Sequence, residues 1–266
     1  GCSSGIGLCV ARGLHARGWR VFASARKPAD VDRLAREGLK SLLLDLDDSA
    51  SITAAVGEVL ARTGGTLDAL FNNGAYGQPG AVEDLSREVL RAQFETNLFG
   101  WHELTRLVLP VMRRQGHGRI IQHSSVLGFV ALSYRGAYNA SKYALEGLTD
   151  TLRLELRDSN IHVSLIDTGP VTSRFRENAH AAFLRNIDRA NSVHREHYAR
   201  VVKRLTTKGA VVPFTLPPEA VLKQVVRALE SRNPRPRYYV TFPTYLFAFL
   251  KRILPQRVLD RILYKI

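Results

Sequence analysis

The chain opens with a glycine-rich turn that runs directly into an amphipathic helix. Its first residues are Gly1-Cys2-Ser3-Ser4-Gly5-Ile6-Gly7, and apolar residues then recur at helical spacing to residue 17. Glycines let backbone N–H groups approach a pyrophosphate, and a helix N-terminus adds a favourable dipole. The candidate phosphate-binding residues are Gly1, Ser3, Ser4, Gly5, Ile6 and Gly7. A glycine turn without function is the alternative, which the strand expected at residues 19–25 weakens.

Apolar strand patterns alternate with amphipathic helical patterns along the chain. We expect strands at residues 19–25, 41–44, 67–72, 119–123, 161–166 and 237–242, and helices at residues 6–17, 29–37, 49–63, 87–114, 137–159 and 218–231. This alternation predicts an α/β fold with a doubly wound, Rossmann-like parallel sheet, covered on both faces, in a single domain over residues 1–266. The apolar run at residues 42–44 is typical of a central strand.

Three segments depart from this regular alternation. A phosphate-binding turn joins a strand to a helix, so we expect a first strand ahead of Gly1 that is missing from the chain. Residues 174–210 are polar, basic and weakly periodic, and we interpret them as a helical substrate loop over the active-site cleft. Residues 243–266 form an amphipathic C-terminal segment.

The net charge of +14 is large for 266 residues. It suits nucleic acid, anionic lipid, or anionic cofactors and substrates. The basic residues are spread along the chain without a zinc-finger, helix-turn-helix or aromatic–basic RNA motif, so we expect no nucleic-acid partner. The histidines show no ligand spacing apart from His194 and His197, so we expect no metal site.

Cysteine usage and hydropathy bear on the compartment. Cys2 and Cys9 lie seven residues apart in a predicted turn and helix, which argues against a disulfide framework and suits a reducing compartment such as the cytoplasm. The sequence has no signal-peptide pattern, and no apolar run reaches the ~20 residues that span a bilayer.

The strand expected at residues 19–25 ends in two cations, Arg26 and Lys27. A carboxylate there would accept hydrogen bonds from a ribose 2′-hydroxyl, whereas a guanidinium can bind a 2′-phosphate with two hydrogen bonds. We therefore expect NADP(H) as cofactor, with Arg26 as the main determinant and Lys27 or Ser4 assisting. A solvated strand end is the alternative.

Two further strand ends carry candidate cofactor contacts. Asp45 and Leu46 follow the second strand, where an adenine would lie, although Asp45 suits a helix N-cap nearly as well. Asn73 and Gly74 follow the third strand and fit a turn against a ribose, with a plain turn as the alternative.

Tyr138 and Lys142 are separated by one helical turn and so share a helix face. A cation beside a phenol favours the phenolate, so we expect Lys142 to lower the pKa of Tyr138. Ser125 follows the apolar run at residues 120–121 and can hydrogen-bond an oxygen held near the phenol. Asn97 is unfavourable inside a helix, and we expect it to kink the helix and hold a water near Lys142.

These signals occur in an order and spacing that resemble the short-chain dehydrogenase/reductase family along residues 1–175. The chain is most similar to bacterial NADP-dependent aldehyde reductases and their retinol and 17β-hydroxysteroid dehydrogenase relatives. The resemblance implies that Tyr138 is the acid/base, that Lys142 supports it and binds cofactor, that Ser125 orients the substrate, and that Asn97 is the helix asparagine. It also implies cofactor contacts by Val171 and by Ser173, where the family has threonine.

Two turns differ from the family pattern. The family's Asn-Asn-Ala-Gly turn has its last two residues exchanged at Gly74 and Ala75, and the family's Pro-Gly is replaced by Thr168-Gly169-Pro170. The first change alters the backbone beside the ribose, and the second makes the carboxamide contact of Val171 less secure. Neither change removes a catalytic group.

The resemblance implies an oxidoreductase that transfers a hydride between NADP(H) and a hydrophobic carbonyl or alcohol, such as an aldehyde, retinoid or steroid-like compound. A non-catalytic NADP-binding or membrane-associated scaffold is the alternative. The apolar stripes and cations of residues 243–266 suit peripheral contact with the inner face of a membrane and core packing equally. The long helices at residues 87–114 and 137–159 fit the family's contact in a homodimer or tetramer.

Overall fold

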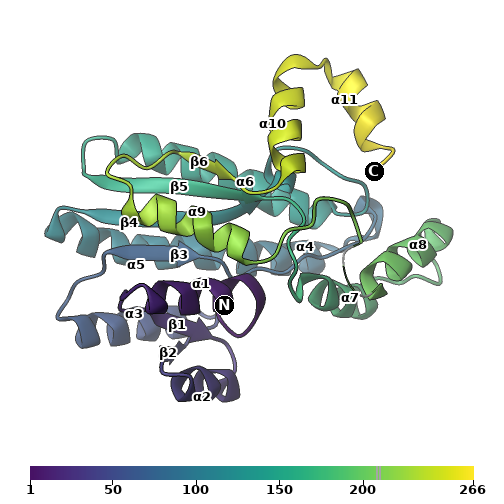
Figure 1. The fold of residues 1–266 in the computed structure, drawn as a ribbon. Coiled ribbons are helices and arrows are strands. Elements are labelled where there is room, and N and C mark those ends of the chain that lie inside the picture. Colours follow the sequence, from purple (N-terminus) through teal and green to yellow (C-terminus); the bar gives the residue numbers. More distant parts are fainter. Residues whose placement is uncertain (208, 210) are drawn as a thin grey trace.

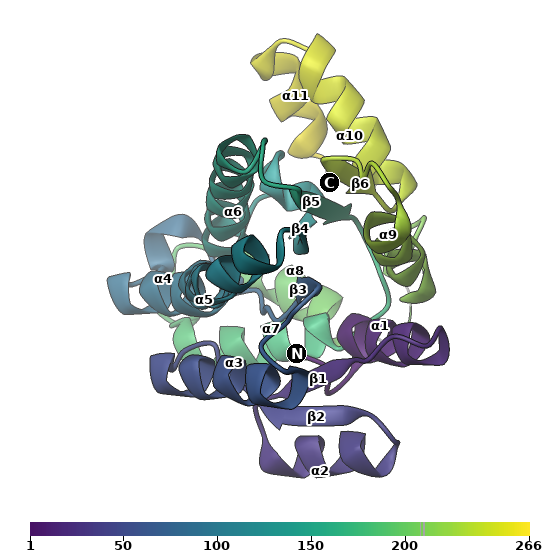
Figure 2. The ribbon, with the colours of Figure 1, turned by 90° about the vertical axis from the view of Figure 1, so that its left-hand side faces the viewer.

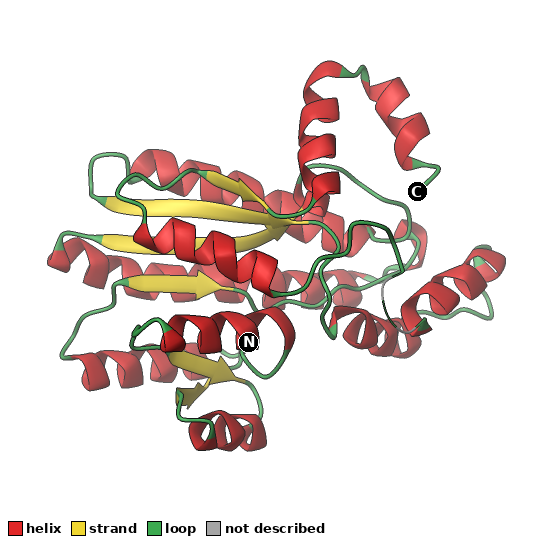
Figure 3. Cartoon of the chain, viewed as in Figure 1, coloured by secondary structure: helices red, strands yellow, loops and turns green. Residues whose placement is uncertain are grey.

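Helices cover parallel strands on both faces in this computed structural model, which describes residues 1–207, 209 and 211–266 (Figures 1 and 2). Each strand pair in the described residues is parallel. Figure 3 shows strand and helix alternating along most of the chain. The predicted α/β architecture with parallel sheets is confirmed.

The strands lie in two groups. β1 (Phe22–Ala25) pairs with β2 (Lys40–Leu43), and a second sheet has the order β3 (Ala69–Asn72), β4 (Gly118–Ser125), β5 (Ile161–Thr168) and β6 (Arg237–Tyr239). β2 is therefore an outer strand, and Leu43 is 47% exposed. The expectation of a central strand at residues 42–44 is wrong, because an apolar run does not distinguish a central strand from an edge strand.

A cavity of about 280 Å³ lies between the two sheets. Residues of both β1 and β3 line it, among them Phe22, Ser24, Leu70 and Phe71. Within the described residues, β1 and β3 make no ladder with each other. The strand expected ahead of Gly1 stays a prediction.

The helices form two layers (Figure 2). One layer contains α1 (Gly5–Ala16) and α9 (Glu219–Glu230), and the other contains α3 (Ser49–Thr63), α5 (Gly100–Gln115) and α6 (Gly136–Glu155). α2 (Pro28–Arg36) packs on β1 and β2. The helix expected at residues 87–114 is divided into α4 (Arg87–Phe94), a π turn η2 (Glu95–Phe99) and α5.

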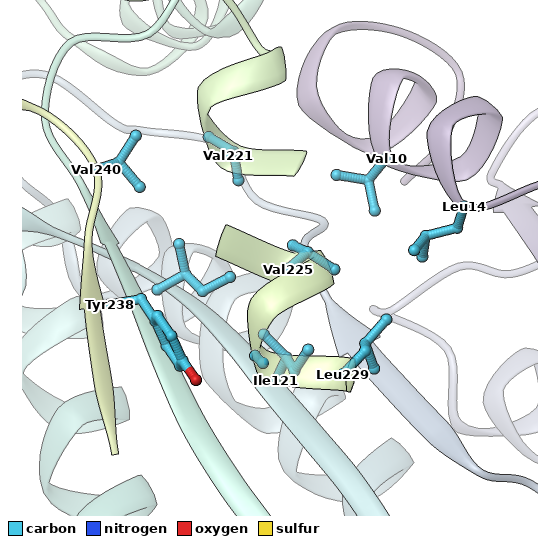
Figure 4. Packing of buried hydrophobic residues seen from close by; sticks show 10 residues of the cluster. Val10, Leu14, Ile121, Val221, Val225, Leu229, Tyr238 and Val240 are labelled. Atoms are coloured by element: carbon cyan, nitrogen blue, oxygen red, sulfur yellow. The ribbon is translucent and has the colours of Figure 1, made fainter. Parts of the chain in front are cut away.

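The core between α1, α9 and the four-stranded sheet is built from interdigitating aliphatic side chains (Figure 4). Val10 and Leu14 of α1 face Val221 and Val225 of α9, above Ile121 of β4. Burying each such side chain stabilises the fold by about 1.5–3 kcal/mol. This core holds α1 against α9 and the four-stranded sheet.

Two helical pairs lie outside these layers (Figure 1). α7 (Phe175–Asn186) and α8 (Arg195–Thr206) occupy the segment expected to form the substrate loop, in which residues 208 and 210 lie outside the described part. α10 (Phe242–Ile253) and α11 (Gln256–Leu263) form a hairpin that projects from the body. None of the described helices has both the length and the apolarity that crossing a membrane requires.

The C-terminal hairpin carries two apolar stripes, the first within residues 246–253 and the second within residues 258–266, and they differ in burial. Leu259 and Leu263 of α11 are buried against Val130, together with partly buried Leu250 and Leu254. On α10, by contrast, Phe242, Tyr245, Leu246, Phe249 and Ile253 are exposed. Core packing therefore accounts for Leu259 and Leu263 of the second stripe, whereas Val258, Ile266 and most of the first stripe are exposed.

Candidate active site

The four predicted catalytic side chains meet at the carboxyl ends of the strands. Ser125 is the last residue of β4, Tyr138 and Lys142 lie in the first turns of α6, and Asn97 lies in η2. The η3 turn (Val126–Gly128) joins β4 to the segment before α6 and packs against α6. The fold thus gathers residues that are up to 45 positions apart in the sequence.

The Ser125 hydroxyl group both donates and accepts a hydrogen bond. Its Oγ donates to the Thr168 carbonyl at 3.3 Å and accepts from the Leu127 amide at 3.2 Å. These contacts cap η3 and fix the serine at the end of the strand. A contact with Ser125 also lowers the pKa of the Tyr138 phenol, so the two hydroxyl groups face the same space.

Burial raises the pKa of Tyr138 to about 12, against smaller opposing effects of Ser125 and of the Arg135 charge. The expectation that Lys142 lowers this pKa is wrong. Burial of the phenol raises its pKa by more than nearby charge lowers it, and the cation that lowers it is Arg135. The phenol is therefore protonated at neutral pH. Its ring packs edge-to-face on Phe175 at 5.2 Å between centroids.

Lys142 is 1% exposed. Its Nζ donates to the His123 carbonyl at 2.7 Å and lies 4.2 Å from the centre of the Trp101 ring and 5.8 Å from the centre of the Tyr138 ring. Burial lowers the pKa of Lys142 to about 7, and the charges of Glu146 and Asp167 oppose that shift.

The sequence analysis missed a buried acidic cluster behind Lys142. Glu146 accepts a hydrogen bond from Ser124 and forms an ion pair with Arg237. Arg237 Nη1 also lies 3.4 Å from Asp167 Oδ2. Burial and the neighbouring Glu146 raise the pKa of Asp167. The available signal was the position of Glu146, one helical turn beyond Lys142 on the same face.

Asn97 lies inside the π turn η2, which interrupts the helix where we expected a kink. Its side chain accepts from the Tyr76 amide at 3.3 Å and donates to the Tyr76 carbonyl at 2.9 Å. It also donates to Ser141 Oγ of α6 at 3.3 Å. Asn97 therefore ties the loop after β3 to the helix that carries Tyr138 and Lys142.

The glycine-rich turn fits the phosphates of a dinucleotide. Gly5 has φ +55°, and Ser4 is extended with no side-chain cap, so the first amides of α1 have no side-chain partner there. A Cβ on Gly7 would lie 2.0 Å from the Gly1 carbonyl oxygen, which makes glycine necessary. The position of a Cβ on Gly5 is 3.1 Å from Ser173 Cβ, so Ser173 lies beside the turn as expected.

Arg26 and Lys27 follow β1 and are exposed, in line with a 2′-phosphate contact. A different cation holds the turn itself: Arg33 of α2 donates to the Ser3 carbonyl at 2.6 Å. The sequence analysis missed this role of Arg33. Ser3 therefore has its backbone carbonyl fixed by α2 rather than free for a ligand.

Asp45 and Asp48, in the acidic run after β2, have different structural roles. Asp48, not Asp45, caps α3 by accepting from the Ala50 amide at 2.9 Å. Asp45 accepts from the Asp47 amide at 3.2 Å and so shapes the turn before α3. Leu46 packs against α5, where a Cβ on Gly100 would lie 2.2 Å from the Leu46 carbonyl oxygen.

Asn73 links the glycine-rich turn to His123, whose carbonyl accepts a hydrogen bond from Lys142. Its Nδ2 donates to the Gly1 carbonyl at 3.3 Å, and its Oδ1 lies 2.8 Å from His123 Nδ1. The neighbouring Gly74 carbonyl accepts from Trp101 Nε1 at 2.7 Å. The turn with the exchanged residues is thus fixed on both sides, although Ala75 stands where the family has glycine.

Val171 is placed by a short parallel bridge with Leu216. The Thr172 amide donates to the Leu216 carbonyl at 3.0 Å, and the Leu216 amide donates to the Pro170 carbonyl at 3.1 Å. The altered turn at residues 168–170 is therefore an ordered connection from β5 to α7.

A cavity of about 640 Å³ opens beside Tyr138. Its apolar wall comes from η3, α7, α8 and α11 and includes Leu127, Phe175, Leu205 and Leu263. Across the described chain, no group of three or more His, Cys, Asp or Glu side chains is arranged to hold a metal ion.

Comparison with known proteins agrees with this geometry. A family model described as short chain dehydrogenase matches residues 1–182. The chain belongs to the short-chain dehydrogenase/reductase family. It is 43% identical over 263 residues to the uncharacterized oxidoreductase YbbO of Escherichia coli strain K12, covering 99% of this chain and 91% of that protein.

A human relative and a solved structure extend the comparison. Human 17-beta-hydroxysteroid dehydrogenase type 1 is 33% identical over 257 residues, covering 91% of this chain and 76% of that protein. The structure of an actinorhodin polyketide ketoreductase with NADPH has a TM-score of 0.74 and 28% identity, covering 90% of this chain and 93% of that one. The comparisons thus identify the protein as an oxidoreductase of the short-chain dehydrogenase/reductase family.

Proposed function

We propose that this short-chain dehydrogenase/reductase reduces hydrophobic carbonyl compounds with NADPH and oxidises the corresponding alcohols in reverse. The observation that carries the proposal is the Tyr138 hydroxyl, which contacts the Ser125 side chain and belongs to a residue that lines the cavity, with burial raising its pKa to about 12. A phenol with this pKa carries its proton at neutral pH, which suits proton donation.

In the proposed mechanism, Ser125 and Tyr138 hydrogen-bond the substrate carbonyl oxygen. The carbonyl carbon would accept a hydride, which is the chemistry that NADPH would supply when bound. Tyr138 then donates its proton to the developing alkoxide, which leaves a phenolate for solvent to reprotonate. Acid catalysis of this kind typically accelerates a reaction by about 10²–10⁴-fold.

Lys142 and Asn97 have supporting roles in this proposal. Lys142 sits above the Trp101 ring, with its ammonium directed at the end of β4. There it can bind ribose hydroxyls and stabilise the phenolate that forms after proton transfer. Asn97 fixes the loop at Tyr76 and, through Ser141, the helix that carries both catalytic side chains.

The proposed preference for NADP(H) depends on the end of β1. Arg26 and Lys27 are both exposed there, and neither position carries a carboxylate to repel a 2′-phosphate. The actinorhodin ketoreductase, a relative in fold at 28% identity, was solved with NADPH.

The apolar wall of the cavity beside Tyr138 supports a hydrophobic substrate such as an aldehyde, a retinoid or a steroid-like compound. The name of the human relative points to a hydroxysteroid, which is a large apolar alcohol.

The direct experiment is NADPH oxidation against a panel of aliphatic aldehydes, retinal and ketosteroids, repeated with NADH. We expect turnover that increases with substrate hydrophobicity and favours NADPH. Tight NADPH binding without turnover on any member of the panel would instead support the non-catalytic scaffold.

We also propose peripheral contact with anionic lipid through α10, which would place the protein on the cytoplasmic face of a membrane. The exposed face of α10 includes Leu246, Phe249 and Ile253, with Lys251 and Arg252 at its end. Binding to vesicles of phosphatidylglycerol should weaken with added salt and with the paired change Phe249→Ser and Ile253→Ser. Equal binding by this variant would contradict the contact.

A homodimer or tetramer through α5 and α6 is the remaining proposal. Leu148 and Leu154 are exposed on α6, the helix that the family resemblance assigns to subunit contact. Light scattering during gel filtration should give a dimer or larger assembly, which Leu154→Glu should weaken. A monomer at micromolar concentration would contradict it.

A further inference from the structure

The cavity beside Tyr138 is strongly cationic as well as apolar. The basic residues that line it are Arg135, Arg176, Arg200, Arg204 and Lys265, and the described lining contains no Asp or Glu. Arg26 and Lys27 do not line this cavity, so the cluster is separate from the candidate 2′-phosphate contact. Neither the acid/base chemistry nor the apolar wall explains so much positive charge.

Arg135 is held in place by strained backbone immediately before α6. Tyr134 has φ +61°, which is rare for a residue with a side chain. The Tyr134 carbonyl accepts from the Gly80 amide at 3.0 Å, and the Arg135 carbonyl accepts from the Asn139 amide at 2.8 Å. This conformation places Arg135 one helical turn before Tyr138, on the wall of the same cavity.

Arg204 of α8 lies near enough to Arg135 for its charge to act on that guanidinium. Burial and the charge of Arg204 lower the pKa of Arg135 to about 9, and burial and the charge of Arg176 lower that of Arg204. In the described part of the chain, neither guanidinium donates a hydrogen bond or makes an ion pair. Arg176 differs, because it donates to the carbonyls of Arg204 and Thr207.

Arg135 and Arg204 are half-buried in one cavity, and two cations so placed repel each other unless an anion compensates them. Guanidinium groups match carboxylate and phosphate oxygens in geometry as well as charge. The apolar part of the same lining, which includes Leu127, Leu205 and Leu263, suits an aliphatic chain instead. A neutral steroid or retinoid would use this wall but leave the cations without a partner.

We infer that the substrate is an amphiphilic carbonyl compound whose anionic group, a carboxylate or a phosphate, binds between Arg135 and Arg204. Its aliphatic part lies along the apolar wall, and its carbonyl group reaches Tyr138. This inference rests on the proposed reductase function and narrows its substrate class from hydrophobic to anionic and amphiphilic.

The first test compares two aldehydes of equal chain length, 9-oxononanoate and nonanal, in NADPH oxidation. We expect kcat/KM to be at least about tenfold higher for the acid, equivalent to one charge-assisted contact. Arg204→Gln should remove this preference by lowering kcat/KM for the acid to about that for nonanal. The matched control is Arg195→Gln, which removes an exposed charge from the same helix outside the cavity lining and should keep the preference.

The second test measures binding without turnover, by calorimetry with decanoate, decyl phosphate and decanol. We expect the two anions to bind at least about tenfold more tightly than decanol, and Arg204→Gln to abolish the difference. The tighter anion identifies the group as carboxylate or phosphate. Arg135→Lys tests the second cation with its charge retained, and a folded variant should bind decanoate less tightly because a lysine cannot donate in the same forked geometry.

The outcomes separate the two proposals. Nonanal turnover without a preference for the acid, together with equal binding of decanoate and decanol, overturns the anionic substrate and leaves the reductase intact. Decanoate binding that depends on Arg204, with no turnover of any aldehyde, supports the anion site and contradicts the reductase. An acid preference that survives Arg204→Gln overturns the assigned position of the anion.

Discussion

The Lys142 ammonium donates a 2.7 Å hydrogen bond to the carbonyl of His123, the third-last residue of β4. The His123 ring in turn contacts Asn73 Oδ1 at 2.8 Å and Thr168 Oγ1 at 3.2 Å. Burial and the charge of Lys142 lower the pKa of His123 to about 3, so the ring is neutral at pH 7. The lysine is thus positioned by the ends of three strands rather than by Tyr138.

Lys142→Met should change stability in a pH-dependent way. The native pKa is about 7 and the ordinary lysine value is 10.5, so between these values the unfolded chain binds more protons than the native protein. Native stability due to this group therefore rises as pH increases from 7 to 10.5. Wild type therefore gains stability over this range, whereas Lys142→Met lacks this gain. The unfolding free energy of the variant minus that of wild type should fall as pH rises, by at most about 1.4 kcal/mol per pH unit.

Urea denaturation at pH 6.5, 7.5, 8.5 and 9.5 measures this difference. Lys203→Met is the control, because Lys203 is exposed on α8. Its difference from wild type should stay flat. A flat difference for Lys142→Met as well would mean that Lys142 is not desolvated as described.

Arg26→Gln should weaken NADPH binding and leave NADH binding nearly unchanged. A charge-assisted hydrogen bond to a phosphate is worth roughly 1.5–3 kcal/mol, so the Kd for NADPH should rise about tenfold to a hundredfold. Arg36→Gln is the control, because Arg36 is an exposed cation at the far end of α2. Equal losses for both cofactors would show that Arg26 does not contact the 2′-phosphate.

Gly169→Ala should destabilise the protein because a Cβ there would lie 2.1 Å from Thr241 Oγ1. Overpacking of this kind costs about 1–3 kcal/mol. The double variant Gly169→Ala with Thr241→Ala should recover part of the loss, since it removes the clashing oxygen. Gly147→Ala on exposed α6 has no atom within 4 Å and should stabilise the helix by about 1 kcal/mol instead. Thermal unfolding of the four proteins decides the matter.

The sequence predicted the fold well where period and turn chemistry agree. The helix at residues 49–63 is α3 without change, because Asp48 caps its start and Gly64 ends it in the left-handed conformation. The division of residues 87–115 into α4, η2 and α5 was visible only as an unfavourable asparagine. Sheet position was not predictable for β2, because burial on a strand depends on neighbours distant in sequence.

The site shows a similar limit. The spacing of Tyr138 and Lys142 correctly placed them on one helix face. The predicted direction of the Tyr138 pKa shift was wrong, because sequence spacing contains no information about how deeply the phenol is buried. The pairing of Glu146 with Arg237 joins residues 91 positions apart and follows only from the fold. The cations at 135 and 204 likewise line one cavity only in the folded chain, because 69 positions separate them in the sequence.

The central claim is that Tyr138 donates the proton to the substrate. The measurement is NADPH oxidation with nonanal by wild type and by Tyr138→Phe, alongside NADPH binding by each. We predict that the variant binds NADPH as wild type does and loses about 10²–10⁴-fold in turnover. Turnover equal to wild type in a correctly folded Tyr138→Phe protein would contradict the account.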